Sequence, residues 1–405
     1  MKPPPVQHSP FAPFRQPVFR AIWIAMLVSN FGAVMQSVGA AWLMVSMSSS
    51  AQMVALVQSS VTIPIMLLAL FSGAVADSYD RRRIILIAQL LMLVASVALT
   101  ILTVMGYVAP VSLLLLTLTV GIGTSLNGPA WQASIRDQVP AEDIPAAVSL
   151  NSIGFNLARS LGPALGGAIM VVAGPAANFA INSCTYLLLI TVLLRWQLEA
   201  RPLPRREPLL KAIGAGISHA WENQTIRNAL IRTTWFGVMS GAFLALLPLV
   251  AKTLMGGDQF TFGILLGAFG MGSVAGAMIA VRLRAKASNE IAYVASNLFY
   301  AGATFAAATV TDLWIALPLI ALGGIGWVVA NSTINIVVQF ASAEHVVGRS
   351  ISLYHMLTFG GMAIGSYCWG LLADHIGLAE ALTVSGVMLV AGTFLGFVAP
   401  LSKEN

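Results

Sequence analysis

Arg159 is the residue whose position in this sequence most needs a chemical explanation. It lies near the middle of an apolar run at residues 145–172, and a charge at the centre of a bilayer costs about 3 kcal/mol on insertion scales. No Asp or Glu lies at comparable depth in any apolar run. We therefore expect Arg159 to face the protein interior, where backbone carbonyls, an amide such as Asn156 or an anionic small molecule would accept its hydrogen bonds. A purely structural tether between helices is the alternative.

The other polar groups at this depth are amides, tryptophan rings and a histidine. An amide in a membrane helix hydrogen-bonds either a ligand or a neighbouring helix, and a tryptophan offers a flat apolar contact. The candidate substrate-pathway residues are Asn30, Gln36, Asn127, Trp131, Asn156, Arg159, Trp235, Asn331 and Asn335. His355, beside Tyr354, titrates at about pH 6.5 and is the candidate proton carrier; a hydrogen-bonded interior histidine is the alternative.

Sequence patterns of enzyme active sites are missing. The sequence contains no H-E-x-x-H, no G-x-S-x-G, no paired carboxylates within an apolar run and no phosphate-binding P-loop. The two cysteines, Cys184 and Cys368, give neither a disulfide framework nor a thiolate metal cluster. We therefore expect no enzyme activity, no drive by ATP, no metal and no cofactor.

The composition shows which elements must carry these residues. The chain is 58% hydrophobic and 9% charged, whereas a soluble domain is about 25% charged. A helix needs about 20 mostly apolar residues to cross a bilayer, and a spanning segment must satisfy its own backbone. Twelve such runs predict an all-α polytopic membrane protein: 19–45, 51–76, 84–105, 110–135, 145–172, 175–196, 228–254, 260–281, 289–310, 313–340, 348–373 and 378–400.

The distribution of Lys and Arg predicts the orientation. With twelve spans, all 21 basic residues except Lys252 and Arg159 lie on the side of the N-terminus, so this side is the cytoplasm and holds both termini. The predicted units are an N-terminal tail (1–18), a six-helix bundle (19–196), a linker with an amphipathic helix (197–227), a second six-helix bundle (228–400) and a C-terminal tail (401–405). Because the basic residues are dispersed over many loops, we expect no nucleic-acid binding.

The two predicted bundles repeat one another at an offset of 203 residues, the difference between positions 73 and 276. The matching pairs are Gly73-Ala74 with Gly276-Ala277, Gly121-Ile122-Gly123 with Gly324-Ile325-Gly326, Ser149-Leu150 with Ser352-Leu353, and Gly162 with Gly365. A parallel repeat of six spans is similar to the arrangement of secondary transporters of the major facilitator type, which bind substrate between the halves near mid-membrane.

The loop after the second run resembles the G-x-x-x-D-x-x-x-R-[RK] loop of the major facilitator superfamily. It reads Gly73-Ala-Val-Ala-Asp77-Ser-Tyr-Asp80-Arg81-Arg82-Arg83, and Ser78 and Asp80 depart from the family pattern. The resemblance implies a latch in which Asp77 holds the inner side closed against the start of the eleventh span, near Arg349. An ordinary basic loop on the cytoplasmic side is the alternative.

The fifth run resembles one branch of that superfamily, the transmembrane secretion effectors, which includes enterobactin-type siderophore exporters. The stretch from Ala147 to Gly167 ends in Gly162-Pro163-Ala-Leu-Gly166-Gly167, and close helix packing alone is the alternative explanation of these small residues. The residues assigned to gating are Gly73, Asp77, Arg81, Arg82, Arg349, Gly162, Pro163, Gly166 and Gly167.

The resemblance implies a function as well as a fold. We expect a monomeric, proton-coupled secondary exporter that moves small amphipathic molecules, siderophore or drug-like, across the bacterial plasma (inner) membrane by alternating access. Its expected partners are the small-molecule substrate and the lipid bilayer, and the first, fourth, seventh and tenth spans would line its cavity. An intramembrane lipid-modifying enzyme, a major facilitator importer of a small polar solute and a passive channel are the alternatives.

Overall fold

The computed structural model describes residues 9–196, 218, 220–284, 287–343 and 346–401, and every regular element in these ranges is helical. The longer elements are α1 (Pro17–Met47), α2 (Ala51–Ser78), α3 (Arg81–Val104), α4 (Pro110–Ser134), α5 (Ile144–Arg195), α7 (Gln224–Leu249), α8 (Gln259–Arg284), α9 (Asn289–Thr309), α10 (Leu313–Ala341), α11 (Val347–Ile376), α12 (Leu378–Thr393) and α13 (Leu395–Val398). Most of the predicted linker helix falls on residues 197–217 and 219, outside the described residues.

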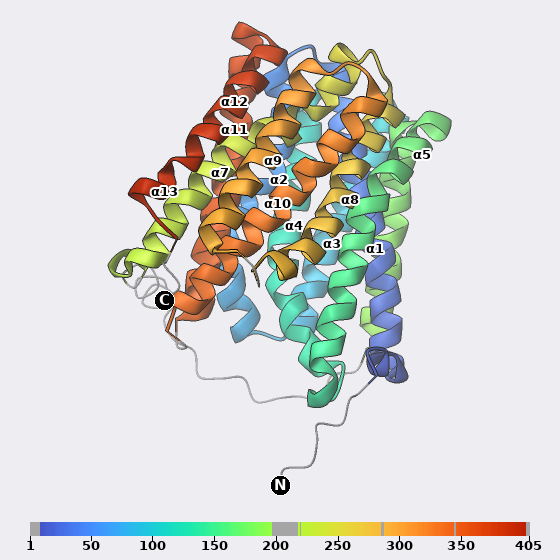
Figure 1. Ribbon diagram of the computed structural model, residues 1–405. Coiled ribbons are helices and arrows are strands. Elements are labelled where there is room, and N and C mark those ends of the chain that lie inside the picture. Colours follow the sequence, from blue (N-terminus) through green and yellow to red (C-terminus); the bar gives the residue numbers. More distant parts are fainter. Residues whose placement is uncertain (1–8, 197–217, 219, 285–286, 344–345, 402–405) are drawn as a thin grey trace.

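Helix α5 is long enough to hold two of the twelve predicted spans. Within the described ranges, eleven helices are long and apolar enough to cross a membrane. Helix α5 has 52 residues, which would extend about 78 Å if straight, more than twice the thickness of a bilayer core. Gly174 breaks it with a φ of 73°, a left-handed conformation that suits glycine, and Pro175 follows. Its two arms therefore correspond to the predicted fifth and sixth spans, and they meet at one end of the bundle (Figure 1).

The chain begins and ends at the same end of the bundle (Figure 1). We call this the terminal end, and we call the opposite end, where α1 ends and α2 begins, the far end. Part of the predicted N-terminal tail is ordered at the terminal end, because η1 (Ala12–Arg15) places the ring of Phe14 5.0 Å from that of Trp23. Leu401, predicted to lie in the C-terminal tail, is buried and donates its N–H to Glu290 at 3.2 Å.

Each half is built on the same set of helix contacts. In the first half α1 packs on α5, α2 on α4, and α3 on α4 and α5; in the second half α7 packs on α11, α8 on α10, and α9 on α10 and α12. Gly121 of α4 lies against the carbonyl of Ser60 in α2, and Gly324 of α10 lies against the carbonyl of Phe269 in α8. The offset of 203 residues thus joins glycines with the same packing role, and the predicted six-helix repeat is confirmed.

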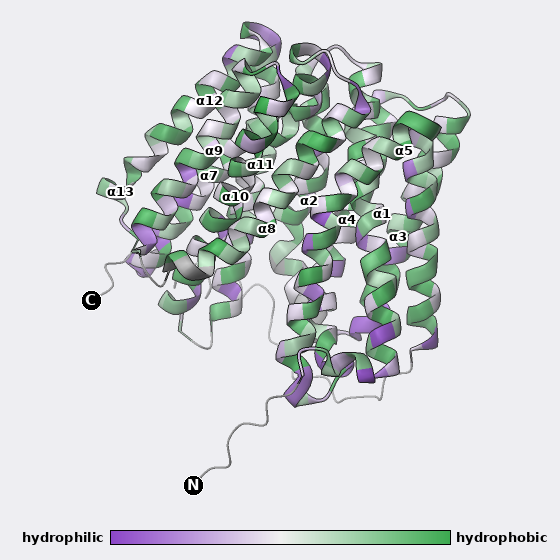
Figure 2. Ribbon diagram, turned by 45° about the vertical axis from the view of Figure 1, so that its right-hand side comes forward, coloured by the Kyte–Doolittle hydropathy of each residue, from purple (hydrophilic) through white to green (hydrophobic). Residues whose placement is uncertain are grey.

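The two halves meet along two antiparallel helix pairs, α2 with α11 and α5 with α8. The helices consist largely of hydrophobic residues, and many of the hydrophilic residues lie toward the helix ends (Figure 2). Val172, Leu115 and Ile364 are among the large apolar side chains that are exposed. A surface this apolar is suited to contact with lipid.

Carboxylate caps fix where two helices of the second half begin at the far end. Asp312 accepts hydrogen bonds from the backbone N–H groups of Trp314 and Ile315 at the start of α10. Asp258 does the same for Phe260 and Thr261 at the start of α8. The backbone hydrogen bond from Thr261 is the main cause that lowers the pKa of the Asp258 carboxyl below its ordinary value.

Candidate functional site

The contact of α5 with α8 joins the halves at mid-membrane and is made of small residues. Gly270 of α8 lies against the backbone of Arg159 and Ser160, and Gly263 lies against that of Pro163 and Gly167. Residues without large side chains let two helix backbones approach closely. The predicted functional arginine therefore lies at the boundary between the halves.

The Gly-Pro-x-x-Gly-Gly motif faces two helices at once. Gly162 packs on Val34 of α1 and Gly166 packs on Met35 of α1, both within the first half. Gly167, one residue further on, packs on the backbone of Gln259 in α8, in the second half. The motif thus forms a three-helix junction that connects packing inside one half to packing between the halves.

Arg159 is electrostatically coupled to the phenol of Tyr300 on α9, in the second half. Tyr300 donates its own hydroxyl proton to the carbonyl of Ser240 at 3.0 Å. In the part of the chain that the structure describes, no hydrogen bond or ion pair reaches the guanidinium group of Arg159. Asn156, an expected partner, instead donates its amide to the carbonyl of Ser152 at 2.8 Å.

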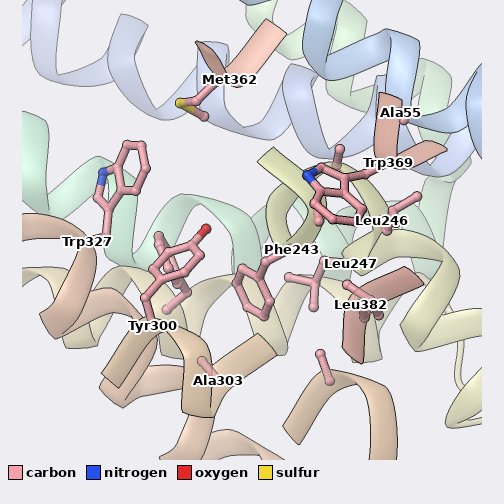
Figure 3. Close-up of a cluster of buried hydrophobic side chains, with 14 of the residues drawn as sticks. Ala55, Phe243, Leu246, Leu247, Tyr300, Ala303, Trp327, Met362, Trp369 and Leu382 are labelled. Carbon is pink, nitrogen blue, oxygen red and sulfur yellow. The ribbon is translucent and has the colours of Figure 1, made fainter. Parts of the chain in front are cut away.

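Aromatic rings surround Tyr300. It lies between Trp327 of α10 and Phe243 of α7 (Figure 3), with ring centroids 6.0 and 5.6 Å away, and Phe236 is 5.4 Å away. The cluster is buried. The Arg159 cation therefore borders an apolar, aromatic region of the second half rather than a set of carboxylates.

Tyr354 of α11 contacts both Asn331 of α10 and its own neighbour His355. The hydroxyl of Tyr354 donates to Oδ1 of Asn331 at 3.0 Å, and the ring of His355 lies 5.1 Å from the Tyr354 ring and 6.2 Å from that of Phe359. Asn335, one turn after Asn331, accepts a 2.5 Å hydrogen bond from the amide of Gln339.

Several predicted pathway residues instead make contacts within one half. Oε1 of Gln36 accepts hydrogen bonds of 2.6 Å from both Ser96 and Asn182, and Asn127 accepts a 3.3 Å bond from Gln89. Trp131 lies in a buried apolar cluster of the first half, and Trp235 donates to the carbonyl of Met388 in α12. Asn30 is partly buried on α1.

The arginines of the loop after α2 bind helix ends of their own half. Arg81 donates to the carbonyl of Ala133 and pairs with Asp137 at 3.0 Å. Arg82 donates to the carbonyls of Leu193 and Leu194, in the last turn of α5. A cation at a helix C-terminus satisfies free carbonyls and complements the helix dipole. These two arginines thus stabilise the terminal end of the first half.

The predicted latch lies at the terminal end of α2 and α11. Gly73 has Ser352 of α11 as its nearest neighbour across the halves, with 3.9 Å between its Cβ position and the hydroxyl oxygen. The side chain of Asp77 lies outside the described residues, and Arg349 lies in the first turn of α11. Their pairing stays a prediction.

The same two helices are closely packed toward the far end. The Cβ position of Gly370 in α11 is 2.8 Å from Cα of Gln52, and the hydroxyl of Ser59 donates to the carbonyl of Ala363 at 2.9 Å. The backbones of α2 and α11 thus approach closely at the far end, and the contact at Gly73 near the terminal end is an ordinary van der Waals contact.

A buried ion pair in the second half has no sequence signal. Arg232 of α7 has no exposed side-chain surface and makes hydrogen bonds of 2.6 and 2.7 Å to the two carboxylate oxygens of Glu290. Its guanidinium carbon lies 4.6 Å from the centroid of the Tyr293 ring. Because Glu290 also accepts the N–H of Leu401, the pair holds the C-terminal residues on α7 and α9. No metal-binding group of three His, Cys, Asp or Glu side chains exists among the described residues.

One known protein family matches almost the whole of this chain. The sequence profile of the transmembrane secretion effector family matches residues 8–405. The chain belongs to this family. It is therefore a multi-pass membrane transporter of the major facilitator superfamily, as the sequence motifs predict.

Three relatives illustrate the range of the family. The staphyloferrin A transporter of Staphylococcus aureus is 24% identical over 365 residues, which cover 88% of this chain and 90% of the relative. The multidrug efflux pump Tap of Mycobacterium tuberculosis is 24% identical over 96% of this chain and 95% of its own length. The enterobactin exporter EntS of Salmonella typhi is 26% identical over 92% of this chain and 90% of its own length.

Solved structures confirm the fold. A bacterial homolog of the human lysosomal transporter Spinster superposes with a TM-score of 0.75 at 15% identity, covering 96% of this chain and 97% of that one. A D-xylose-proton symporter superposes with a TM-score of 0.69 at 14% identity, and the match covers 94% of this chain and 97% of the symporter. At these identities the likeness concerns the fold alone.

Proposed function

We propose that this protein is a proton-coupled secondary exporter that moves small amphipathic molecules, siderophore or drug-like, out of the cytoplasm by alternating access. The observation that carries the proposal is Arg159, a cation at the boundary between two matched six-span halves and without a hydrogen-bond acceptor among the described residues. A mid-membrane charge in such a position is a candidate functional site. The named activities of two relatives, the efflux pump Tap and the enterobactin exporter EntS, support export.

The close packing of α2 on α11 toward the far end supports a conformation that is closed at the far end, and we take its pathway to open toward the terminal end. The bias of Lys and Arg makes that end the cytoplasmic side of a bacterial plasma membrane. Substrate would enter from the cytoplasm, and rocking of the halves about the contact of α5 with α8 would carry it outward. Backbone contacts such as that of Gly270 with Arg159 allow this movement without interlocked side chains.

Individual residues have distinct proposed roles. Arg159 binds an anionic or strongly polar part of the substrate, and Asn30, Asn156, Asn331 and Asn335 contribute weaker polar contacts along the pathway. His355, held between aromatic rings, carries the proton. Gly73, Asp77 and Arg349 close the terminal end when the halves rock. The predicted pathway residues Gln36, Asn127, Trp131 and Trp235 act through packing, since their described contacts lie within one half.

A flux assay in proteoliposomes with an imposed proton gradient tests the proposal. The panel contains a carboxylate siderophore, a catecholate siderophore and a cationic dye, and the variants are Arg159→Ala and Arg159→Lys. A hydrogen bond to a charged group contributes about 1.5–3 kcal/mol, so we expect Arg159→Ala to slow movement of the anionic compounds at least tenfold. Arg83→Ala is the matched control, because the side chain of Arg83 is 82% exposed.

The proposal is refuted if the purified protein moves none of the panel compounds in a gradient-dependent way and Arg159→Ala behaves as the wild type does. Normal rates in Arg159→Ala with an active wild type would refute the role of Arg159 alone. Rates in Arg159→Lys separate a need for charge from a need for the planar guanidinium group.

A further inference from the structure

We propose that Lys252 and Asp374, both in the second half, form a two-point clamp on the turn between α1 and α2. The clamp closes the far end of the transport pathway, and both of its contacts must break before substrate can leave. The inference rests on the proposed alternating access, but its test needs no substrate.

Asp374 binds the start of α2 from the last turn of α11. Its Oδ1 accepts the N–H of Ala51 at 2.6 Å, and its Oδ2 accepts the hydroxyl of Ser50 at 2.6 Å and the N–H of Gln52 at 3.1 Å. The first N–H groups of a helix have no partner within the helix, and the helix dipole makes this end positive. The local cap of α2 is Ser50, whose hydroxyl oxygen accepts the N–H of Met53 at 3.3 Å. A carboxylate from the opposite half thus adds to this local cap.

Lys252 binds the end of α1 with the opposite charge, a cation on a backbone carbonyl. Its Nζ donates a 2.9 Å hydrogen bond to the carbonyl of Val45, which lies in the last turn of α1, before Met47. The last carbonyls of a helix are likewise free, and this end of the dipole is negative. Lys252 itself lies in a π-helical turn, Val250–Leu254, that follows α7. The contact also explains why this lysine stands apart from the basic residues of the other side.

The two contacts form a single device because their signs are complementary. The second half supplies one anion and one cation, and the first half supplies backbone groups between Val45 and Gln52 together with the hydroxyl of Ser50. Each charged side chain faces the helix end that attracts it. A side chain of the opposite charge at position 252 or 374 would therefore be repelled by that helix end. Because each contact joins a residue of the first half to a residue of the second, the clamp exists only when the halves are docked at the far end.

Both charged side chains are exposed, which limits the strength of the clamp and makes it reversible. When the contacts break, water replaces them on the backbone groups and on the charges. A single charge at a helix end corresponds to a factor of about two to five in an equilibrium at such sites. A clamp of this size biases the closed state without locking it, which suits a transporter that must open the far end in every cycle.

Distance measurements between spin labels test the clamp in the full-length protein reconstituted in nanodiscs. With Cys184 and Cys368 replaced by Ser, one label pair reports on the far end, at Tyr107 and Thr309. A second pair reports on the terminal end, at Glu142 and Ala343. All four positions are exposed and each pair joins the two halves. The readout is the fraction of molecules with the longer far-end distance.

We expect Asp374→Asn and Lys252→Gln each to raise the open fraction at the far end by about two- to fivefold. The double variant should raise it further, and the terminal-end pair should shift toward shorter distances. Asp312→Asn is the matched control, because Asp312 caps α10 within its own half. Lys252→Arg keeps the charge and should keep the wild-type distances.

Unchanged far-end distances in both single variants overturn the clamp, and so does an equal shift in Asp312→Asn. If the double variant does not yield a folded monodisperse peak, the single variants decide the question. A far-end shift in a protein that transports none of the panel compounds would support the clamp while refuting the proposed cargo. The two proposals therefore fail separately.

Discussion

Glu290→Gln is expected to destabilise the second half by about 3 kcal/mol, the lower end of the range for breaking a buried ion pair. The change removes the negative partner of Arg232, whose side chain has no exposure, while the Glu290 side chain is 32% exposed. We take the lower end of this range of destabilisation because water has partial access to the side chain at position 290. The cation would retain its contact with the Tyr293 ring, which is too weak to compensate for two charge-assisted hydrogen bonds.

The free energy of unfolding can be measured by titrating the purified protein with SDS and following circular dichroism. Arg83→Ala is the control, because its ion pair with Asp80 is exposed and such pairs contribute about 0–1 kcal/mol. Replacing Arg232 and Glu290 together by Met should restore most of the stability, since no buried charge is left unpaired. If Glu290→Gln costs no more than Arg83→Ala, the buried-pair argument is wrong.

Two further predictions concern the far end and the contact between the halves. Gly167→Leu should reduce transport at least tenfold, because the Cβ position of Gly167 is 2.9 Å from the carbonyl oxygen of Gln259 and overpacking costs about 1–3 kcal/mol. The control variant Gly302→Leu should transport normally, because the space around Gly302 is open. Equal transport rates in the two variants would contradict the packing argument. Asp258→Asn should lower the apparent melting temperature near neutral pH. Because folding lowers the pKa of Asp258 from 3.8, its stabilisation is present above pH 3.8 and is lost as pH falls through the folded pKa, so the melting temperatures of wild type and variant should converge in acid. A difference in melting temperature between wild type and variant that persists at the lowest pH would contradict the stabilising role of the Asp258 carboxylate.

The sequence was sufficient for the spans and the repeat. Apolar length fixes the number of crossings, because a bilayer of constant thickness admits few alternatives, and the glycine pairs at one offset correspond to real helix contacts such as those of Gly121 and Gly324. Close helix packing, the alternative explanation of the small residues in the fifth span, is also present. The Gly-Pro-x-x-Gly-Gly motif needs close backbone approach, and the contact of α5 with α8 supplies it.

The directions in which single polar side chains point were not accessible from the sequence. A soluble helix reveals its buried face by the contrast between apolar and polar residues, but a membrane helix is apolar all round. Gln36 therefore gives no sign that it faces Ser96 and Asn182 rather than the other half. The ion pair of Arg232 with Glu290 joins two residues that are 58 positions apart on different helices. Most contacts of Lys252 and Asp374 end on backbone atoms, for which no residue type is diagnostic.

The small-residue contact of α5 with α8 has a consequence for the entropy of transport. Gly and Ala lose no side-chain conformational entropy on burial, whereas a long side chain such as Lys, Arg or Met loses about 1.5–2 kcal/mol at 25 °C. At Gly263, Gly267 and Gly270 the side-chain conformational entropy of this surface therefore does not change when the halves dock or separate. The halves can separate and rejoin there with little change in conformational freedom, so the balance between the two states is left to groups that sense substrate and solvent.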